Sequence, residues 1–423
     1  MNRMLRHRLT LALFTSMIGC GGTTFRCDPG PSWSSNPPVM LDAAMPTCTA
    51  STCAVETVSA GARHACAVVG SGREVVCWGA NEVGQSDWRA PREVTAPVRI
   101  NQRVDYQLNR HDTPLAAGEL RSCVVVGSGI VCWGGPTPSP EIIPAPVVDG
   151  VEVGLDDVCW GSACLSGALD SSQGSRILLS GATRARWREG VWRVEGRVPV
   201  AGLLRERPTF EMEIPGPFEE TTLRFDSRRR VALAAGALHS CIRDEPSVVG
   251  GIVVAGGIRC IGRGDRGQLG ADYLATAEPE GTGVPTATEI PSNYQVRTIR
   301  VGGHLGARWT PEGVVTSGPL GGHTCFATLY SGPDSGVFCM GANDRGQLGV
   351  GSTDDTNTFV RVVGLPEGPV EDVRCGGEFT CARTGGGLFC WGDNRYGQLG
   401  VDPSVMAFSA TPVRIDLASA FTR

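Results

Sequence analysis

A segment that recurs along the chain constrains the fold more than any other feature. Residues 58–85 and 373–400 follow the same pattern: a Gly precedes a stretch with one Cys, a turn follows, and Cys-Trp-Gly leads into a Gly-Gln loop. Self-similarity of this kind indicates a repeat architecture, in which one structural unit is copied along the chain. The glycines that open the copies are Gly61, Gly118, Gly154, Gly181, Gly236, Gly302 and Gly376.

The number of copies is seven or eight. The copies that open at Gly154 and Gly181 are weak, and a further hairpin around His323 carries its own Cys325 and Cys339. If that hairpin belongs to the copy that opens at Gly302, the count is seven, and if it stands alone the count is eight.

Each copy predicts two short strands joined by a tight turn. Runs such as Ala67–Val69 and Val124–Val126 are rich in β-branched residues, and Gly-Ser-Gly or Gly-Gly-Gly follows the first strand. The distance between copies varies more than a stacked solenoid tolerates, whereas the blades of a propeller accept such variation. A content of 58 Gly and 28 Pro suits this turn-rich architecture. We therefore expect an all-β fold, a β-propeller of about seven blades.

The repeat resembles that of a known family. The pattern His-x-Cys-Ala, then Cys-Trp-Gly-x-Asn, then Gly-Gln-Leu-Gly at residues 267, 346 and 397 is similar to the regulator of chromosome condensation repeat, whose members form seven-bladed β-propellers. Its best-known member is a nuclear guanine-nucleotide exchange factor for a small GTPase that also binds chromatin. The resemblance implies the fold, whereas the activity has to be argued from the site.

The N-terminus predicts export. Arg3, Arg6 and Arg8 precede an apolar stretch that is too short to span a bilayer. The stretch ends in Met17-Ile-Gly-Cys20, which resembles the lipobox of bacterial lipoproteins and implies cleavage before Cys20 and lipidation of that residue. An ordinary secreted protein is the alternative.

The chain divides into three parts on these grounds. Residues 1–19 are the predicted lipoprotein signal peptide, and residues 20–54 are a Gly/Pro/Ser-rich tether with too few apolar residues to fold. Residues 55–423 are the predicted repeat β-propeller. We expect a protein exported to the cell envelope and held there by its lipid, facing the periplasm or the cell surface.

The cysteines predict disulfides within the repeats. There are 17 in the chain, and setting Cys20 aside for the lipid leaves an even number. Two strands of an antiparallel hairpin bring opposite side chains close enough for a disulfide. The predicted pairs are Cys66 with Cys77, Cys123 with Cys132, Cys159 with Cys164, Cys241 with Cys260, Cys325 with Cys339, and Cys381 with Cys390. Cys48 and Cys53 pair by proximity, and the partners of Cys27 and Cys375 stay open.

The copy at Gly302 offers a comparison. Alignment of Gly302 with Gly376 places Ala307 and Thr316 where the other copy has its two cysteines. This copy is therefore expected to have lost both members of the pair together.

Composition excludes several chemistries. All 38 basic residues are Arg, so no Lys is present for a phosphate loop, a kinase site or a Schiff base. A net charge of −5 argues against a nucleic-acid partner. The run Gly262-Arg-Gly-Asp-Arg-Gly267 matches a dinucleotide fingerprint, but no helix pattern follows it, and the repeat loop explains it.

Three His-x-Cys pairs could suggest a nucleophile with its base, or metal ligands. They recur at one repeat position, at His64, His239 and His323, which favours a packing role. The same reasoning assigns the Trp of each Cys-Trp-Gly to the blade core rather than to a ligand platform. We assign no catalytic, cofactor-binding or metal-binding residue.

The expected function is a non-enzymatic, lipid-anchored scaffold that binds a protein or another envelope ligand as a monomer. The alternatives are a guanine-nucleotide exchange factor-like regulator of a small GTPase and an enzyme with an unrecognised site. We expect variable recognition residues in the irregular stretches 168–232 and 271–297, and we place the partner surface in the first, which is rich in Arg. We also expect the C-terminal strand around Thr411–Ile415 to close the ring.

Overall fold

The computed structural model describes residues 54–421 with gaps, and only isolated strands within 145–234 and 271–295. Cys20, the predicted signal peptide and the tether up to residue 53 lie outside the described residues. No helix in the described part of the chain is long and apolar enough to cross a membrane.

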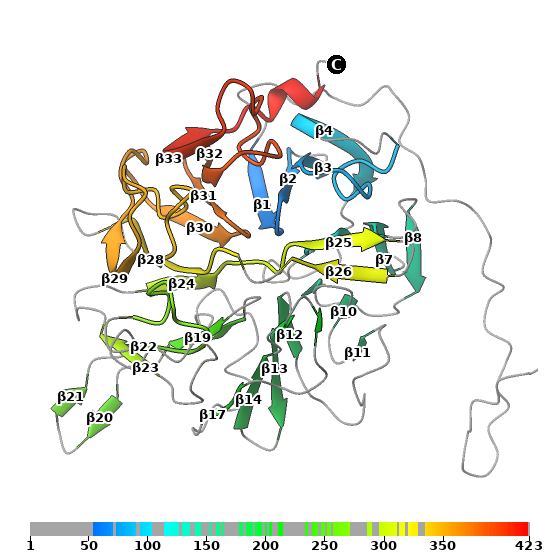
Figure 1. Ribbon diagram of the computed structural model, residues 1–423. Coiled ribbons are helices and arrows are strands. Elements are labelled where there is room, and N and C mark those ends of the chain that lie inside the picture. The colour runs from blue at the N-terminus through cyan, green and yellow to red at the C-terminus, as the bar shows by residue number, and fades with distance from the viewer. Residues whose placement is uncertain are drawn as a thin grey trace, which may run out of the picture. The chain divides into compact units, whose positions relative to one another are not determined.

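The described strands form seven antiparallel sheets of three or four strands, which we call blades 1 to 7 (Figure 1). Blade 1 holds β1 (Val55–Ala60), β2 (His64–Val69), β3 (Glu74–Gly79) and β4 (Val94–Arg103). Blade 2 holds β5 (Leu115–Ala117), β6 (Arg121–Val126), β7 (Gly129–Gly134) and β8 (Glu141–Pro144). Blade 3 holds β9 (Glu152–Val153), β10 (Val158–Trp160) and β11 (Ala163–Cys164), and blade 4 holds β12 (Ile177–Ser180), β13 (Thr183–Arg188), β14 (Val191–Gly196) and β17 (Phe210–Ile214).

Blade 5 holds β18 (Leu233–Ala235), β19 (His239–Arg243), β22 (Gly257–Gly262) and β23 (Thr286–Glu289). Blade 6 holds β24 (Val296–Val301), β27 (His323–Thr328), β28 (Val337–Gly341) and β29 (Thr356–Arg361). Blade 7 holds β30 (Val370–Cys375), β31 (Phe379–Thr384), β32 (Gly387–Asp393) and β33 (Phe408–Arg414). Three two-stranded hairpins are inserted: β15 (Pro199–Val200) with β16 (Leu203–Leu204), β20 (Ser247–Val249) with β21 (Ile252–Val254), and β25 (Ala307–Thr310) with β26 (Gly313–Thr316).

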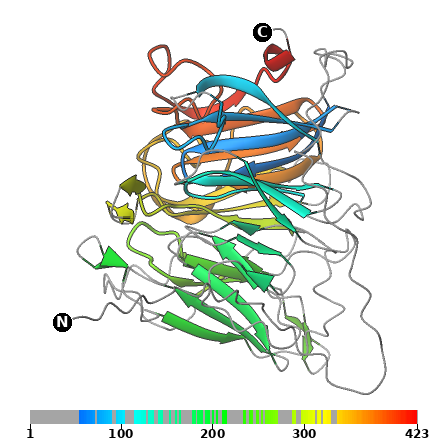
Figure 2. The same cartoon turned by 90° about the vertical axis from the view of Figure 1, so that its right-hand side faces the viewer.

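The blades form a closed ring through their first strands. Contacts run from β1 to β5, β9, β12, β18, β24 and β30 in turn, and β30 returns to β1. Figure 2 shows blades 1 and 7, the two ends of the repeat region, side by side. The fold is therefore the predicted β-propeller, with seven blades among the described residues.

Each glycine that opens a repeat copy directly follows the first strand of a blade, and close approach explains why it is Gly. A Cβ on Gly61 would lie 2.3 Å from the carbonyl oxygen of Gly118 in blade 2 and 2.7 Å from the His64 ring. A Cβ on Gly376 would meet the Phe379 ring at 2.2 Å and the Gly61 carbonyl oxygen at 2.7 Å. No side chain fits between the inner turns of adjacent blades.

The two hairpins that follow Gly302 belong to one blade. β24 pairs directly with β27, so the His323 hairpin is the body of blade 6 and the intervening β25 and β26 are an insertion. Ala307 and Thr316 do face each other, but inside that insertion. Their alignment with the cysteines of blade 7 was therefore wrong, because the counterparts of those cysteines in blade 6 are Cys325 and Cys339.

The stretch 168–232 is also not the loop that we expected. Residues 177–214 supply β12, β13, β14 and β17, which make blade 4. The weak copy that opens at Gly181 is this blade, but without a cysteine pair its pattern did not show that the whole stretch is built of strands. Replacing the whole stretch by a linker would remove a blade from the ring.

The C-terminus closes the ring by packing rather than by sharing a strand. β33 pairs with β32 of its own blade, and no strand pairing joins blades 1 and 7 among the described residues. The residues after β33 instead pack in one cluster with Val58 and Trp78 of blade 1. Ile415 takes the place that Val362 takes after β29, at the core between its own blade and the next. The C-terminal strap, residues 415–421, thus follows the path of an inter-blade linker.

The strap makes a stability prediction. Ile415→Ala and Leu417→Ala should each lower the free energy of unfolding by about 2–4 kcal/mol, because both side chains are buried between blades 7 and 1. Asp416→Ala, at the exposed position between them, is the matched control and should change it by less than about 0.5 kcal/mol. Urea unfolding of the oxidised protein measures all three, and equal midpoints would show that the strap does not hold the ring closed.

Candidate functional site

Five of the six predicted cysteine pairs are disulfides in the structure. Each joins directly opposite residues on the second and third strands of a blade, with Cα–Cα distances of 4.0–4.1 Å. The bonds are Cys66–Cys77, Cys123–Cys132, Cys241–Cys260, Cys325–Cys339 and Cys381–Cys390. They anchor the centre of five blades.

The remaining cysteines have different outcomes. Cys159 and Cys164 face each other across β10 and β11, with side chains outside the described residues. Cys375 is a free thiol, and burial raises its pKa to about 12. Its sulfur, that of Cys325 and a ring nitrogen of His323 lie within 4.8 Å of one another. Cys325 is committed to a disulfide, so this group is not a metal site in the oxidised protein.

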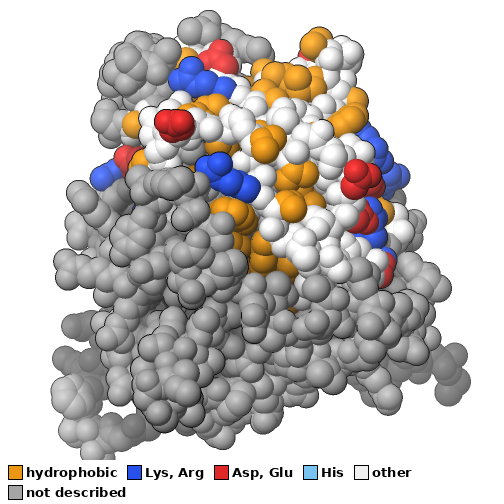
Figure 3. Space-filling model, turned by 90° about the vertical axis from the view of Figure 1, so that its left-hand side faces the viewer, with side chains coloured by type: hydrophobic (Ala, Val, Ile, Leu, Met, Phe, Trp, Pro, Cys, Tyr) orange, Lys and Arg blue, Asp and Glu red, His pale blue; other side chains and the backbone are white. Residues whose placement is uncertain are grey.

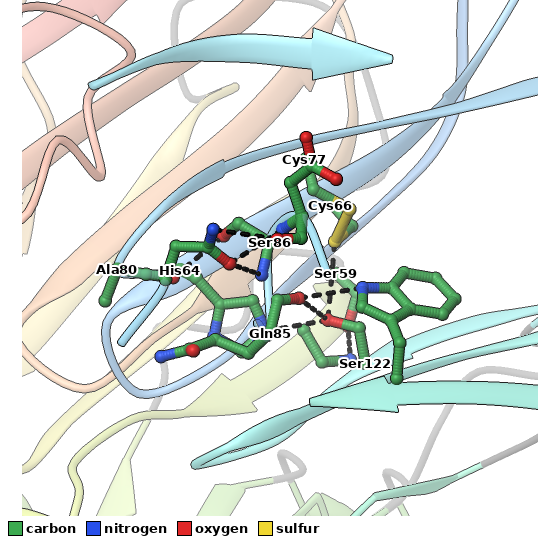
Figure 4. The surroundings of a disulfide bond; sticks show 12 residues. Ser59, His64, Cys66, Cys77, Ala80, Gln85, Ser86 and Ser122 are labelled. Atoms are coloured by element: carbon green, nitrogen blue, oxygen red, sulfur yellow. Dashed lines mark hydrogen bonds between the residues drawn. A yellow bond between two sulfur atoms is a disulfide. The ribbon is translucent and has the colours of Figure 1, made fainter. Parts of the chain in front are cut away.

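The His-x-Cys histidines make a joint between adjacent blades (Figure 4). His64 Nε2 lies 2.8 Å from the Ser122 hydroxyl of blade 2, and that hydroxyl donates to the Gln85 main-chain oxygen of blade 1 at 2.9 Å. Since the hydroxyl proton is used on Gln85, His64 must donate from Nε2. The histidine is thus the neutral Nε2–H tautomer.

The same joint occurs twice more. His239 of blade 5 contacts the Thr324 hydroxyl of blade 6 at 2.7 Å, and Thr324 donates to the main-chain oxygen of Gln268. His323 of blade 6 contacts the Thr380 hydroxyl of blade 7 at 2.9 Å, and Thr380 donates to the main-chain oxygen of Gln347. The histidines are therefore packing residues, as their repeat position predicted.

The tryptophans of Cys-Trp-Gly complete the joints. Trp133 and Trp391 donate from Nε1 to the main-chain oxygens of Gln85 and Gln347 in the preceding blade, each at 2.9 Å. Trp78 donates to Gln398 at 2.7 Å across the junction of blades 7 and 1. All three side chains are buried, which excludes a ligand platform.

The junction of blades 7 and 1 departs from the pattern. Phe379 stands where blades 1, 5 and 6 have His, and Ala65 stands where blades 2, 5, 6 and 7 have Ser or Thr. The hydroxyl relay is absent there, and the Phe379 ring packs in one apolar cluster with Ala65 and Trp78. This junction depends on apolar contact and on the C-terminal strap.

The Gly-Gln loops have a structural role. In each, the Gln side-chain oxygen accepts the backbone N–H two residues earlier, for example Arg345 N to Gln347 at 2.8 Å and Tyr396 N to Gln398 at 2.8 Å. The apparent dinucleotide fingerprint is one such loop, in which Arg266 N donates to the Gln268 side chain. Nearby, Asp355 pairs with Arg266 and accepts the Asn343 N–H.

Charged residues that differ from blade to blade gather at the turns after the first strands, which we call the axial end. Arg63 pairs with Glu82 at 2.9 Å and lies over the Tyr396 ring, 4.8 Å from its centre. Glu378 pairs with Arg395 at 2.5 Å and has His304 Nε2 at 3.5 Å. Burial alone would raise the pKa of Glu378, but His304 and Arg395 lower it below the ordinary value.

Glu119 of blade 2 reaches across the axial end. Its Oε1 accepts the backbone N–H of Leu305, which belongs to the insertion of blade 6, at 2.7 Å. Glu119 and Glu378 are both buried, 3% and 5% exposed. Neither residue stands out in the sequence, because neither position carries the same residue in another blade.

Comparison with known proteins supports the repeat assignment. Family profiles described as "Regulator of chromosome condensation (RCC1) repeat" match residues 334–383 and 385–422, and residues 55–85 and 370–398. The two matched parts of the chain, residues 55–85 and 334–422, are therefore similar to RCC1 repeats.

Its curated relatives match over short stretches. The X-linked retinitis pigmentosa GTPase regulator of Mus musculus is 42% identical over 77 residues, 18% of this chain and 8% of that protein. The secretion-regulating guanine nucleotide exchange factor of Mus musculus is 42% identical over 89 residues, 21% of this chain and 18% of that protein. The chain thus spans less than a quarter of either relative.

Solved structures are similar over more of the chain. Yeast RCC1 (Prp20), in a crystal structure with Kap60, is 15% identical with a TM-score of 0.44, covering 86% of this chain and 75% of that one. Human WBSCR16 is 15% identical with a TM-score of 0.43, covering 86% of this chain and 81% of that one.

The buried histidines predict acid sensitivity. Burial lowers the pKa of His64 and His239 to about 3 and of His323 to about 4. The unfolded chain binds protons at these residues below about pH 6.5 and the folded chain does not. Stability is thus full above pH 6.5 and falls by up to about 1.4 kcal/mol per pH unit per histidine toward pH 4.

The variant His239→Phe tests this pH dependence, because Phe379 occupies the equivalent position in blade 7. Between pH 6 and pH 4.5 the free energy of unfolding of the variant should fall less steeply than that of the wild type, by about one proton's slope. Thr324→Val is the control, since it removes the hydroxyl and leaves the histidine. Parallel curves for wild type and H239F in urea titrations would contradict the assignment.

The pairing of Cys159 with Cys164 remains a prediction. Their direct opposition in β10 and β11 leads us to expect a sixth blade disulfide. Mass spectrometry of a non-reduced digest should find one cross-linked peptide containing both residues, alongside the five described bonds. Free Cys159 and Cys164 in the same digest would contradict it.

Proposed function

We propose that this chain is a non-enzymatic protein-binding scaffold of the cell envelope, anchored by a lipid on Cys20. One observation supports the binding role: the side chains of the repeat that could do chemistry are committed to structural contacts. The histidines, tryptophans and paired cysteines form joints and disulfides inside the ring. What differs between blades, and so could specify a partner, is the set of loops and charged residues at its surface.

Surface composition supports a protein partner. Figure 3 shows hydrophobic side chains over the described part of one face, with Arg and acidic side chains toward its margins. The exposed apolar residues of the described chain include Val363, Val405 and Phe408, at 45%, 82% and 46% exposure. Apolar surface rimmed by charge is typical of protein interfaces.

The disulfides support an oxidising compartment. Five disulfides within one chain are rare in the reducing cytosol and common in exported proteins. Together with the N-terminal Arg residues and the Met-Ile-Gly-Cys20 sequence, they favour an envelope protein.

Regulation of a small GTPase is the second candidate. It is favoured by the names of the two relatives above, a GTPase regulator and a guanine nucleotide exchange factor. Exchange assays with small GTPases, using labelled nucleotide release, test it separately from location.

The anchor is tested by labelling. Wild-type chain expressed in a bacterium with a lipoprotein pathway should incorporate labelled palmitate and fractionate with membranes, because the thioether-linked lipid holds it there. Cys20→Ser should lose the label and leave the membrane fraction, whereas Cys27→Ser is the matched control and should keep both. Equal labelling of wild type and C20S would overturn the anchor.

The binding role is tested by cross-linking in intact envelopes followed by purification under denaturing conditions. A scaffold should yield one or a few specific protein adducts that the H239F variant, with its surface unchanged, also yields. Loss of every adduct, or substrate turnover by purified protein in a broad activity screen, would contradict the proposal.

A further inference from the structure

The insertion of blade 6 covers the axial end of the ring. Blades 1 and 7 connect their first two strands by the short turns 61–63 and 376–378, whereas blade 6 inserts residues 304–321 at this point, including β25 and β26. Figure 1 shows the hairpin crossing the middle of the ring toward blade 2. Contacts agree with a position over the ring: β26 touches β16, in the hairpin inserted between β14 and β17, and the Leu305 N–H donates to Glu119 of blade 2.

Beneath this hairpin, Glu119 is an incompletely satisfied buried carboxylate. Its Oε1 accepts the Leu305 N–H, while its Oε2 is buried without a hydrogen-bond partner. No ion pair to Glu119 exists among the described residues. Glu378, another buried carboxylate at the axial end, is by contrast paired with Arg395.

Burying an unpaired carboxylate costs free energy, and pairing with a cation offsets that cost. We therefore ask which cation Glu119 could bind. A divalent metal ion does not fit, because Ca²⁺ and Mg²⁺ need six or more oxygen ligands and Glu119 is in no described cluster of metal-ligating side chains. A guanidinium or ammonium group needs only one or two acceptors. The chain has no Lys, and none of its described Arg side chains pairs with Glu119.

We propose that Glu119 is the receptor for a basic side chain of a protein partner and that the hairpin 304–321 is its cover. The proposal rests on the proposed function, because it names the place where the scaffold holds its partner. The partner presents an Arg or Lys at the axial end, displaces the hairpin and pairs with Glu119. A basic group is thereby selected over a neutral one.

The experiment removes the cover. Deleting residues 304–321 joins Gly303 to Gly322 and leaves the turn Gly-Gly-Gly before His323, the same length as Gly376-Gly377-Glu378 before Phe379 in blade 7. The probe is Nα-acetyl-arginine amide, and its neutral isostere Nα-acetyl-citrulline amide is the ligand control. Titration calorimetry at low salt measures binding to the wild type, the deletion variant, and the deletion variant with Glu119→Gln or Glu82→Gln.

The deletion variant should bind the arginine probe at least tenfold more tightly than the wild type, and should not bind the citrulline probe. Adding E119Q should abolish binding. Adding E82Q should leave it unchanged, because Glu82 is already paired with Arg63 and more exposed. Intact disulfides and an unchanged circular dichroism spectrum establish that each variant is folded.

Three results would overturn the proposal. The first is no saturable binding to the folded deletion variant, which would mean that Oε2 of Glu119 holds only water. The second is equal binding with and without E119Q. The third is equal binding of the arginine and citrulline probes. Envelope cross-linking of the wild type, a separate measurement, would still report on the scaffold role, so failure of this site and failure of the proposed function are distinguishable.

Discussion

The described ring depends on one contact, in which the main-chain oxygen of the loop Gln in blades 1, 5, 6 and 7 accepts hydrogen bonds from the next blade. The joint is complete at Gln347 of blade 6. Thr380 and Trp391 of blade 7 both donate to its main-chain oxygen, and His323 of blade 6 donates to the Thr380 hydroxyl. Each neutral hydrogen bond contributes only about 1 kcal/mol net. They stabilise the ring mainly because they are buried: breaking one of them leaves polar groups without a partner and out of reach of water.

This contact explains which repeat positions are fixed. The loop glycine before the Gln has a positive φ, 76° at Gly346, and the Gln side chain closes the loop on its own backbone. The loop shape then presents the Gln oxygen to the next blade. Where blade 7 meets blade 1, Phe379 replaces His, and apolar packing with the C-terminal strap substitutes for the relay.

The sequence predicted the parts of the fold that recur. The opening glycines mark the first strands because the close approach of neighbouring turns is the same in every blade, and opposite cysteines follow from hairpin geometry. Blade 6 was misread because its first two strands are separated by an insertion, so that β24 seemed to lack a hairpin. Blade 4 was marked only by the weak copy at Gly181, and the stretch around it was wrongly interpreted as an irregular loop because no disulfide marks its central strands.

The candidate site was harder to predict, because its residues do not recur from blade to blade. The His and Trp joints are visible as a pattern, and their repetition correctly indicated packing. Glu119 has Gly377 at its equivalent position in blade 7, so nothing in the pattern marks it. Its position opposite Leu305 arises only when the ring closes and the insertion of blade 6 crosses to blade 2.

The central claim is that the joints make the ring one cooperative unit. Native-state hydrogen exchange of Trp391→Phe, which removes one donor to Gln347 between blades 6 and 7, tests it most directly. If the claim holds, the slowest-exchanging amides of blades 1 and 2 lose as much protection as those of blades 6 and 7. Loss confined to blades 6 and 7 would show that the blades open independently and would contradict the account.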